Sequence, residues 1–147
     1  MYSVQKIKLL LMALFLLSCL LVEAQMASDL PVAFSKAQET HKKILLIFSG
    51  SDWCAACIRF EKNILDDSHF QQFATENLVV VKADFPQRTK LGREVARQNE
   101  ALAERYNPKG QFPAILLLEP DGSVAGSYDY SNEDAVNFIA FLKKYIL

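Results

Sequence analysis

The chain has 147 residues, of which 51% are apolar, 22% are charged and 11% are aromatic. This composition excludes disordered, collagen-like and low-complexity chains, and the length suits one domain. The 16 basic and 17 acidic residues give a net charge of −1 without a block of like charge, so we expect no nucleic-acid partner. Three cysteines, Cys19, Cys54 and Cys57, are too few for a disulfide-rich mini-protein or a four-cysteine zinc site. A hydrophobic core must therefore stabilise the fold.

The N-terminal segment has the pattern of a secretory signal peptide. Two lysines precede an apolar run at positions 9–22, which is shorter than the roughly 18 to 20 residues that a membrane-spanning helix needs. We predict that residues 1–24 are a signal peptide, cleaved near Ala24, and that residues 25–147 form a periplasmic or secreted domain. One alternative stays open, because the residues before Cys19 resemble a bacterial lipobox and would make that cysteine a lipid anchor.

Apolar spacing predicts alternating helices and strands in the rest of the chain. Unbroken short apolar runs indicate strands that are buried on both faces, whereas spacings of three and four indicate helices. Two early strands separated by helices should pair in parallel, and the last two, joined by a short turn, should pair antiparallel. In order, the predicted elements are a helix from Asp29 to about Thr40, a strand at 44–49, a helix from Cys54 to about Asp66, a helix that begins with a capping box at 68–71, a strand at 78–83, a helix with Leu91, Val95, Leu102 and Tyr106 on one face, strands at 114–118 and 123–128, and a helix with Ala135, Ile139, Leu142 and Ile146 on one face.

The chemistry of this sequence lies in the run Trp53-Cys54-Ala55-Ala56-Cys57. Cys54 opens a helix directly after a buried strand, and the free amides and dipole at that helix end favour its thiolate over its thiol. Cys57 lies three residues later on the same helical face, where the two sulfurs can form a reversible disulfide. Trp53 is either an apolar cover for this pair or an ordinary partly buried aromatic residue. The spacing predicts a redox pair with Cys54 as the nucleophile and Cys57 as the resolving thiol.

The motif resembles the active site of the thioredoxin superfamily, in particular its small exported thioredoxin-like members. The resemblance covers about Leu30 to Leu147 and rests on Trp-Cys-x-x-Cys after the first strand and on Phe112-Pro113 before a later strand. It implies a thioredoxin-like α/β fold, with a central mixed sheet flanked by helices on both faces, and a protein thiol-disulfide oxidoreductase of the reductase or isomerase type. In that family the matching proline has a cis peptide bond beside the disulfide. The resemblance therefore implies that Trp53, Phe112 and Pro113 shape the substrate site, and a proline at the start of a strand is compatible with this role.

Two positions depart from the family pattern. Thioredoxins have a buried carboxylate six positions before the first cysteine, where this chain has Phe48. Lys82 matches the lysine near that carboxylate, and we expect it to lack a partner and to extend toward solvent. Glu61, one turn after Cys57, is either a substitute proton acceptor for the Cys57 thiol or a solvated helix residue.

No cofactor or metal is expected. Only His41 and His69 could supply imidazole ligands, and we predict that His41 lies at the far end of the first strand and His69 in a capping turn. Without a glycine-rich nucleotide loop, electrons must come from a separate membrane or exported thiol partner. The substrates would be protein thiols and disulfides, bound by a monomer. The alternative is a non-catalytic thioredoxin-fold binding module of the cell envelope, with vestigial cysteines and the segment 85–110 as its partner surface.

Overall fold

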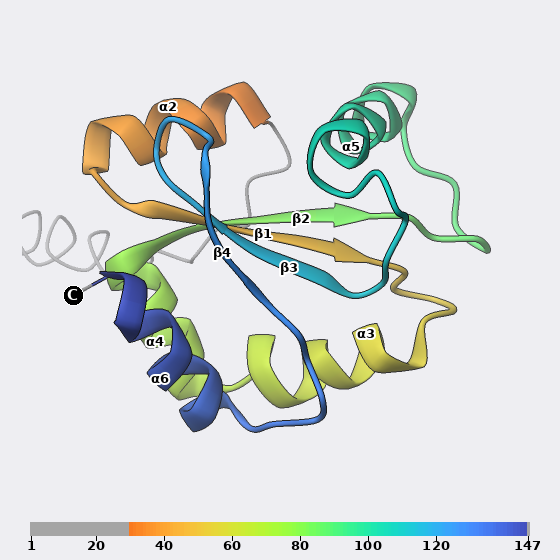
Figure 1. The fold of residues 1–147 in the computed structure, drawn as a ribbon. Coiled ribbons are helices and arrows are strands. Elements are labelled where there is room, and N and C mark those ends of the chain that lie inside the picture. The colour runs from red at the N-terminus through yellow and green to blue at the C-terminus, as the bar shows by residue number, and fades with distance from the viewer. Residues whose placement is uncertain (1–29, 147) are drawn as a thin grey trace, which may run out of the picture.

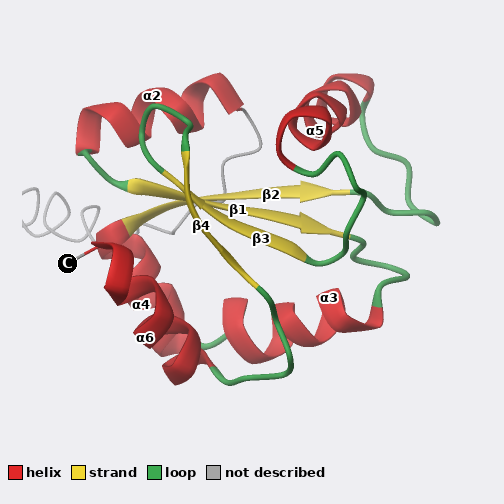
Figure 2. Cartoon of the chain, in the orientation of Figure 1, coloured by secondary structure: helices red, strands yellow, loops and turns green. Residues whose placement is uncertain are grey.

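A four-stranded sheet with helices on both faces forms the fold (Figures 1 and 2). The computed structural model describes residues 30–146, so the predicted signal peptide, its cleavage point and Cys19 lie outside the described residues. Within residues 30–146, no helix is both long and apolar enough to cross a membrane. The elements are α2 (Leu30–Thr40), β1 (Lys43–Ser49), α3 (Ala55–Phe60), η2 (Glu61–Leu65), α4 (Ser68–Asn77), β2 (Leu78–Asp84), α5 (Arg93–Tyr106), β3 (Ala114–Leu118), β4 (Val124–Tyr128) and α6 (Ala135–Ile146).

The strand order is β2-β1-β3-β4, with β1 and β2 parallel and the other two pairs antiparallel. This arrangement confirms the predicted mixed sheet and both predicted pairings. Ser49 pairs with Asp84, and Phe48 pairs with Ala114. The last residues of β1 and β2 and the first residue of β3 therefore lie together at one end of the sheet.

Two apolar layers cover the two faces of the sheet. Leu45 and Ile47 of β1 face the layer that contains residues of α3, η2, α4 and α6, whereas Ile44, Leu46 and Phe48 face the layer that contains residues of α2 and α5. Every β1 residue from Ile44 to Ser49 is buried. Burial on both faces explains why this strand is an unbroken apolar run.

Three helix boundaries differ from the sequence prediction. The helix expected from Cys54 to Asp66 is α-helical only from Ala55 to Phe60 and continues as the π-helical segment η2. The predicted capping box at Ser68 is wrong, because Asp67 is the N-cap of α4 and its carboxylate accepts the amides of His69 and Phe70 at 2.9 and 3.1 Å. Leu91 lies before α5, which begins at Arg93.

Phe48 packs in an apolar layer on the face of the sheet away from Lys82. Its side chain is fully buried in the layer with α2 and α5. Lys82 pairs in register with Ile47, which faces the opposite layer. A carboxylate at position 48 would therefore lie in an apolar layer, with the sheet between it and the Lys82 ammonium.

We expect Phe48→Asp to lower the free energy of unfolding by at least about 3 to 5 kcal/mol, since it removes a buried ring and buries a charge. Phe48→Leu, the control, should cost less than about 1.5 kcal/mol because it preserves an apolar side chain of similar volume. Urea unfolding followed by circular dichroism measures both values. Equal stability of the two variants would contradict this assignment of faces.

Candidate active site

A disulfide between Cys54 and Cys57 lies at the start of α3, with 5.2 Å between the two Cα atoms. Cys54 is the N-cap of α3, with an extended backbone, and its Sγ accepts a hydrogen bond from the Cys57 amide at 3.2 Å. Cys54 is 7% exposed and Cys57 is 2% exposed. The structure thus brings together the two cysteines predicted from the sequence, and the Cys54 sulfur has an amide donor that would stabilise its thiolate.

Gly50 turns the chain from β1 into the cysteine pair. Its carbonyl accepts the amides of Trp53 at 3.2 Å and Cys54 at 2.9 Å. A Cβ atom at this position would lie 2.3 Å from Cε2 of the Trp53 indole, which is closer than any side chain allows. Position 50 therefore requires glycine, because the indole packs directly against its backbone.

Three aromatic side chains from three loops meet beside the disulfide. The Trp53 ring lies 5.3 Å from Phe112 in an edge-to-face contact, and Phe112 lies 5.6 Å from Phe85 in the same geometry. The Trp53 indole nitrogen donates to the Phe85 carbonyl at 2.7 Å, while 39% of the residue stays exposed. The peptide bond from Phe112 to Pro113 is cis. The cluster joins the residue before the first cysteine to the segment that carries Pro113.

Two acidic side chains connect the loop before the cysteines to the loop after β2. Asp52 accepts the amides of Gln87, Arg88 and Thr89 at 2.9, 2.8 and 3.2 Å. Asp84 accepts the amide and hydroxyl of Ser51 at 2.9 and 2.5 Å. The amide of Gln87, assisted by those of Arg88 and Thr89, lowers the pKa of Asp52 below its ordinary value.

Lys82 has an acidic partner, so the expectation that it extends unpaired toward solvent is wrong. Its Nζ lies 2.6 Å from Oε2 of Glu61, and the two side chains are 13% and 34% exposed. The amide of Glu61 donates to the Cys57 carbonyl, which places Glu61 one helical turn beyond that cysteine. A carboxylate and an ammonium group therefore form an ion pair on the face of the sheet that α3 and η2 cover.

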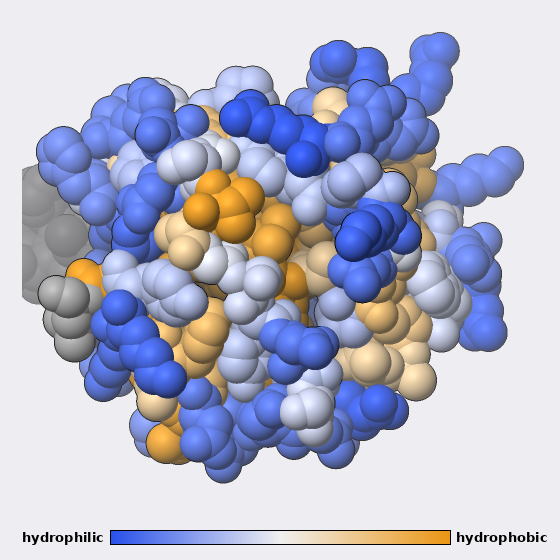
Figure 3. All heavy atoms as spheres, viewed as in Figure 1, coloured by the Kyte–Doolittle hydropathy of each residue, from blue (hydrophilic) through white to orange (hydrophobic). Residues whose placement is uncertain are grey.

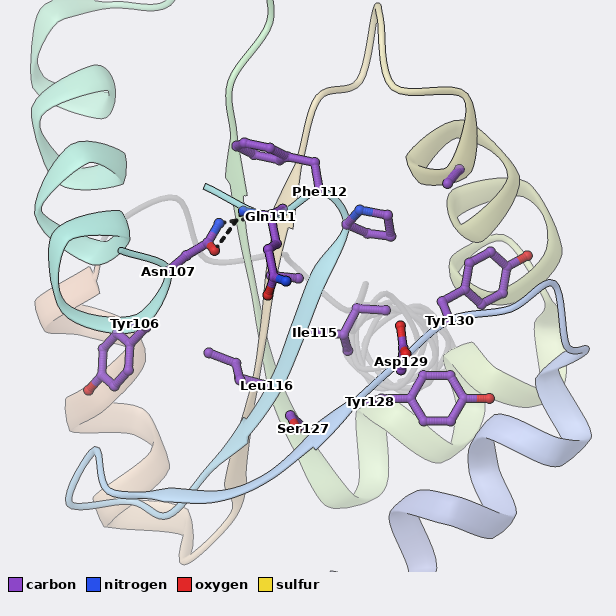
Figure 4. A pocket seen from close by; sticks show the side chains of 13 residues that line it. Tyr106, Asn107, Gln111, Phe112, Ile115, Leu116, Ser127, Tyr128, Asp129 and Tyr130 are labelled. Atoms are coloured by element: carbon purple, nitrogen blue, oxygen red, sulfur yellow. Dashed lines mark hydrogen bonds between the residues drawn. The ribbon is translucent and has the colours of Figure 1, made fainter. Parts of the chain in front are cut away.

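A groove of about 640 Å³ lies next to the cysteine pair, between the end of α5 and α3 and over β3 and β4 (Figure 4). Burial and the nearby Glu133 carboxylate raise the pKa of Tyr128, which lines it, to about 12, so this phenol stays neutral at physiological pH. The groove therefore offers apolar surface, neutral hydroxyl and amide groups, and one carboxylate. Its lining comprises Ala56, Tyr106, Asn107, Gln111, Phe112, Pro113, Ala114, Ile115, Leu116, Ser127, Tyr128, Asp129 and Tyr130.

The two histidines lie apart from the cysteine pair. His41 precedes β1, whereas the cysteines follow it, and the His69 amide is bound by Asp67 in the first turn of α4. In the part of the chain that the structure describes, no three His, Cys, Asp or Glu side chains form a group that could bind a metal.

Sequence analysis missed Asp52 and the groove residues on β4. Asp52 directly precedes the Trp-Cys motif, and an acidic residue in a turn between a strand and a helix is a signal for hydrogen bonds to backbone amides. The segment that supplies those amides lies 35 residues further along, and no local pattern identifies it.

Comparison with known proteins gives a consistent result. A family model described as thioredoxin-like matches residues 25–120. The disulfide bond reductase DsbH of Chlamydia pneumoniae is 37% identical over 90 residues, 61% of this chain and 54% of that protein. The thiol:disulfide interchange protein DsbD of Haemophilus influenzae is 32% identical over 106 residues, 71% of this chain but 17% of that protein. A solved structure of a DsbH oxidoreductase superposes with a TM-score of 0.77 at 28% identity, covering 83% of each chain. The chain thus spans about half the length of the DsbH relative and a smaller part of DsbD.

The Asp52 contacts predict a specific pH dependence of stability. Folding lowers the pKa of Asp52, so the ionised carboxylate stabilises the folded state. This stabilisation is complete above the ordinary carboxyl pKa of about 3.9 and is lost as the pH falls through the lowered pKa of the folded state. We expect Asp52→Asn to unfold at lower urea concentration than the parent at pH 7, and the difference between them to shrink below about pH 4. Urea unfolding at a series of pH values tests this. A difference that is independent of pH would contradict a role for the ionised carboxylate.

Proposed function

The chain belongs to the thioredoxin-like family, and we propose that it is an exported protein thiol-disulfide oxidoreductase of the reductase or isomerase type. The observation that carries this proposal is the Cys54–Cys57 disulfide at the start of α3, with the Cys57 amide donating to the Cys54 sulfur. The names of the DsbH and DsbD relatives, a disulfide bond reductase and a thiol:disulfide interchange protein, support the same reaction class.

In the proposed reaction, the reduced protein transfers two electrons to a substrate disulfide. The Cys54 thiolate attacks one substrate sulfur, forms a mixed disulfide and releases the other substrate sulfur as a thiolate. Cys57 then loses its proton and attacks the Cys54 sulfur, which forms the Cys54–Cys57 disulfide and releases the second substrate thiolate. A separate membrane or exported thiol protein, which becomes oxidised, must reduce the pair again. Cys54 is assigned the first attack because it has the greater exposure and the amide donor.

Glu61 is our proposed proton acceptor for the Cys57 thiol. It lies one turn from that cysteine on the same helix, and its carboxylate contacts the Lys82 ammonium at 2.6 Å. The ammonium compensates the carboxylate charge, and the partial exposure of Glu61 allows the proton to pass to solvent. Position 48 could not supply this proton acceptor, because its side chain faces the other layer of the fold.

The groove beside the disulfide is the proposed binding site for an extended substrate segment. Phe112, Pro113 and Ala56 all line it, Ala56 lies between the two cysteines in the sequence, and Trp53 contacts Phe112. The mostly uncharged lining suits extended segments that bind through backbone and apolar contacts.

We further propose that residues 1–24 direct export and are removed, and that residues 25–147 form the thioredoxin-like domain. The apolar run after two lysines supports this division. Attachment of lipid at Cys19 is the alternative. Mass spectrometry of the N-terminus of the exported protein distinguishes the two, since only the second leaves a modified cysteine at position 19.

Trapping of mixed disulfides tests the proposed function. Cys57→Ser removes the resolving thiol, so covalent adducts between Cys54 and exported proteins should accumulate and disappear on reduction. Cys54→Ser should yield at least about tenfold fewer adducts, because the first attack is then lost. Non-reducing electrophoresis followed by mass spectrometry identifies the adducts. Equal yields from the two variants would contradict the order of attack, and the absence of adducts from both would favour the non-catalytic binding module.

Glu61→Gln tests the proposed proton acceptor. With the carboxylate removed, the second step should slow by about tenfold or more at pH 7, while the first attack by Cys54 keeps its rate. Stopped-flow measurement of formation and resolution of a mixed disulfide separates the two steps. Glu104→Gln, an exposed glutamate on α5, is the matched control and should leave both rates unchanged. An unchanged second step in Glu61→Gln would assign Glu61 a purely structural role.

A further inference from the structure

We propose that the segment 85–93, the loop between β2 and α5 together with the first residue of α5, is a docking arm for acidic segments of the protein whose disulfide reacts at Cys54. This segment is called the basic arm below. The inference rests on the proposed function and adds to it the chemical class of the substrate.

The basic arm carries positive charge that the described residues do not neutralise. It contains Arg88, Lys90 and Arg93 and no aspartate or glutamate. All three side chains are exposed, and within residues 30–146 none of them forms an ion pair. By contrast, Arg97, one turn further along α5, pairs with Glu94 at 2.6 Å. The arm is therefore a local basic surface on a chain whose overall charge is −1.

Hydrogen bonds fix the basic arm to the residues that precede the cysteines. The Asp52 carboxylate accepts three successive arm amides, from Gln87 to Thr89, and the Trp53 indole donates to the Phe85 carbonyl. The Phe85 amide donates to the Ser49 carbonyl at 2.8 Å. Even with the charge of Asp52 included, the arm keeps an excess of two positive charges. The backbone of the arm is thus held in a defined position, so the arm loses little conformational entropy when it binds a partner.

The basic arm lies close to the reacting sulfur. Asp52, which contacts the arm, is two residues from Cys54, a separation of at most about 7 Å between Cα atoms. In Figure 1 the arm projects from the right-hand end of the sheet, from which the chain also leads into α3, and hydrophilic side chains gather along the same margin in Figure 3. The arm is therefore within reach of a protein that presents a disulfide to Cys54.

The residues that flank the disulfide directly carry no charge, since Trp53, Ala55, Ala56, Phe112 and Pro113 are apolar. The groove lining adds one carboxylate, Asp129, and no cation, so it supplies no positive charge of its own for an acidic segment. Charges at the rim of a binding site mainly raise the association rate with a complementary partner. Because the partner must carry a disulfide within reach of Cys54, an acidic protein segment fits this position better than nucleic acid or a lipid surface.

The test compares disulfide exchange with peptides of different charge. The full-length chain with Cys19→Ser, which leaves Cys54 and Cys57 as its only thiols, is reduced beforehand. It then reacts with peptides that hold a fluorescent thiol in a mixed disulfide on a single cysteine flanked by glutamate, serine or lysine. Stopped-flow fluorescence gives the second-order rate constants at about 20 mM and about 500 mM salt. At low salt we expect the glutamate peptide to react about tenfold faster than the serine peptide and the lysine peptide to react more slowly, and at high salt the three rates should converge.

Matched variants assign the effect to the arm. Arg88→Gln combined with Lys90→Gln and Arg93→Gln should remove the preference for the glutamate peptide while the serine peptide keeps its rate, which also shows that the variant is folded. The control variant combines Lys36→Gln on α2 with Lys143→Gln and Lys144→Gln on α6. It lowers the net charge by the same amount as the arm variant and should keep the preference for the glutamate peptide.

Equal rates for the three peptides, or a preference that survives in the arm variant, would overturn the proposal. Equal peptide rates together with arm-dependent binding to vesicles of anionic lipid, or to a nucleic-acid duplex, would make the arm a contact for that other surface instead. No exchange with any peptide, the serine peptide included, would overturn the proposed function itself and the arm's role with it.

Discussion

Burial of β1 on both of its faces is the constraint from which the geometry of the site follows. A strand that is buried on both faces needs a paired neighbour on each edge, and β1 has β2 in parallel on one edge and β3 antiparallel on the other. With that pairing, the ends of β1 and β2 and the beginning of β3 lie at one end of the sheet. The cysteine loop, the basic arm and Pro113 are the segments attached there, although they come from distant parts of the chain. Their proximity is thus a consequence of strand register.

Features that depend on local spacing could be predicted from the sequence. The apolar run of β1, the glycine-proline turn between β3 and β4, and the cysteine spacing each involve residues within one element or turn, where periodicity is informative. Local spacing does not predict the α3-to-η2 transition, the Asp67 cap or the contact of Asp52 with residue 87. At the α4 boundary, Asp67 and Ser68 are both good capping residues, and the choice depends on which of them has an extended backbone. The Asp52 contact depends on the register between β1 and β2, which no local sequence pattern specifies.

The two carboxylates nearest the cysteines along the chain are both compensated. An uncompensated carboxylate near a cysteine would oppose formation of the thiolate, because two negative charges repel each other strongly in a poorly solvated site. Three backbone amides stabilise the Asp52 charge by hydrogen bonds, and the Lys82 ammonium at 2.6 Å balances the Glu61 charge. Neither carboxylate is therefore left without compensating donors or charge beside the cysteine pair.

Placing the carboxylate on the helix rather than on β1 has a physical consequence for the proposed proton transfer. A carboxylate on β1 at position 48 would be enclosed by the layer with α2 and α5 and separated by the sheet from both Lys82 and α3. Glu61, 34% exposed and on the same helix as Cys57, can accept a proton and return it to water without opening the core. The pair is partly buried, at 13% and 34% exposure, so the cost of desolvating both groups offsets much of their attraction and the fold gains little from it. Its value under the proposed mechanism lies instead in keeping a charged, solvent-connected carboxylate one turn from the sulfur that must lose its proton.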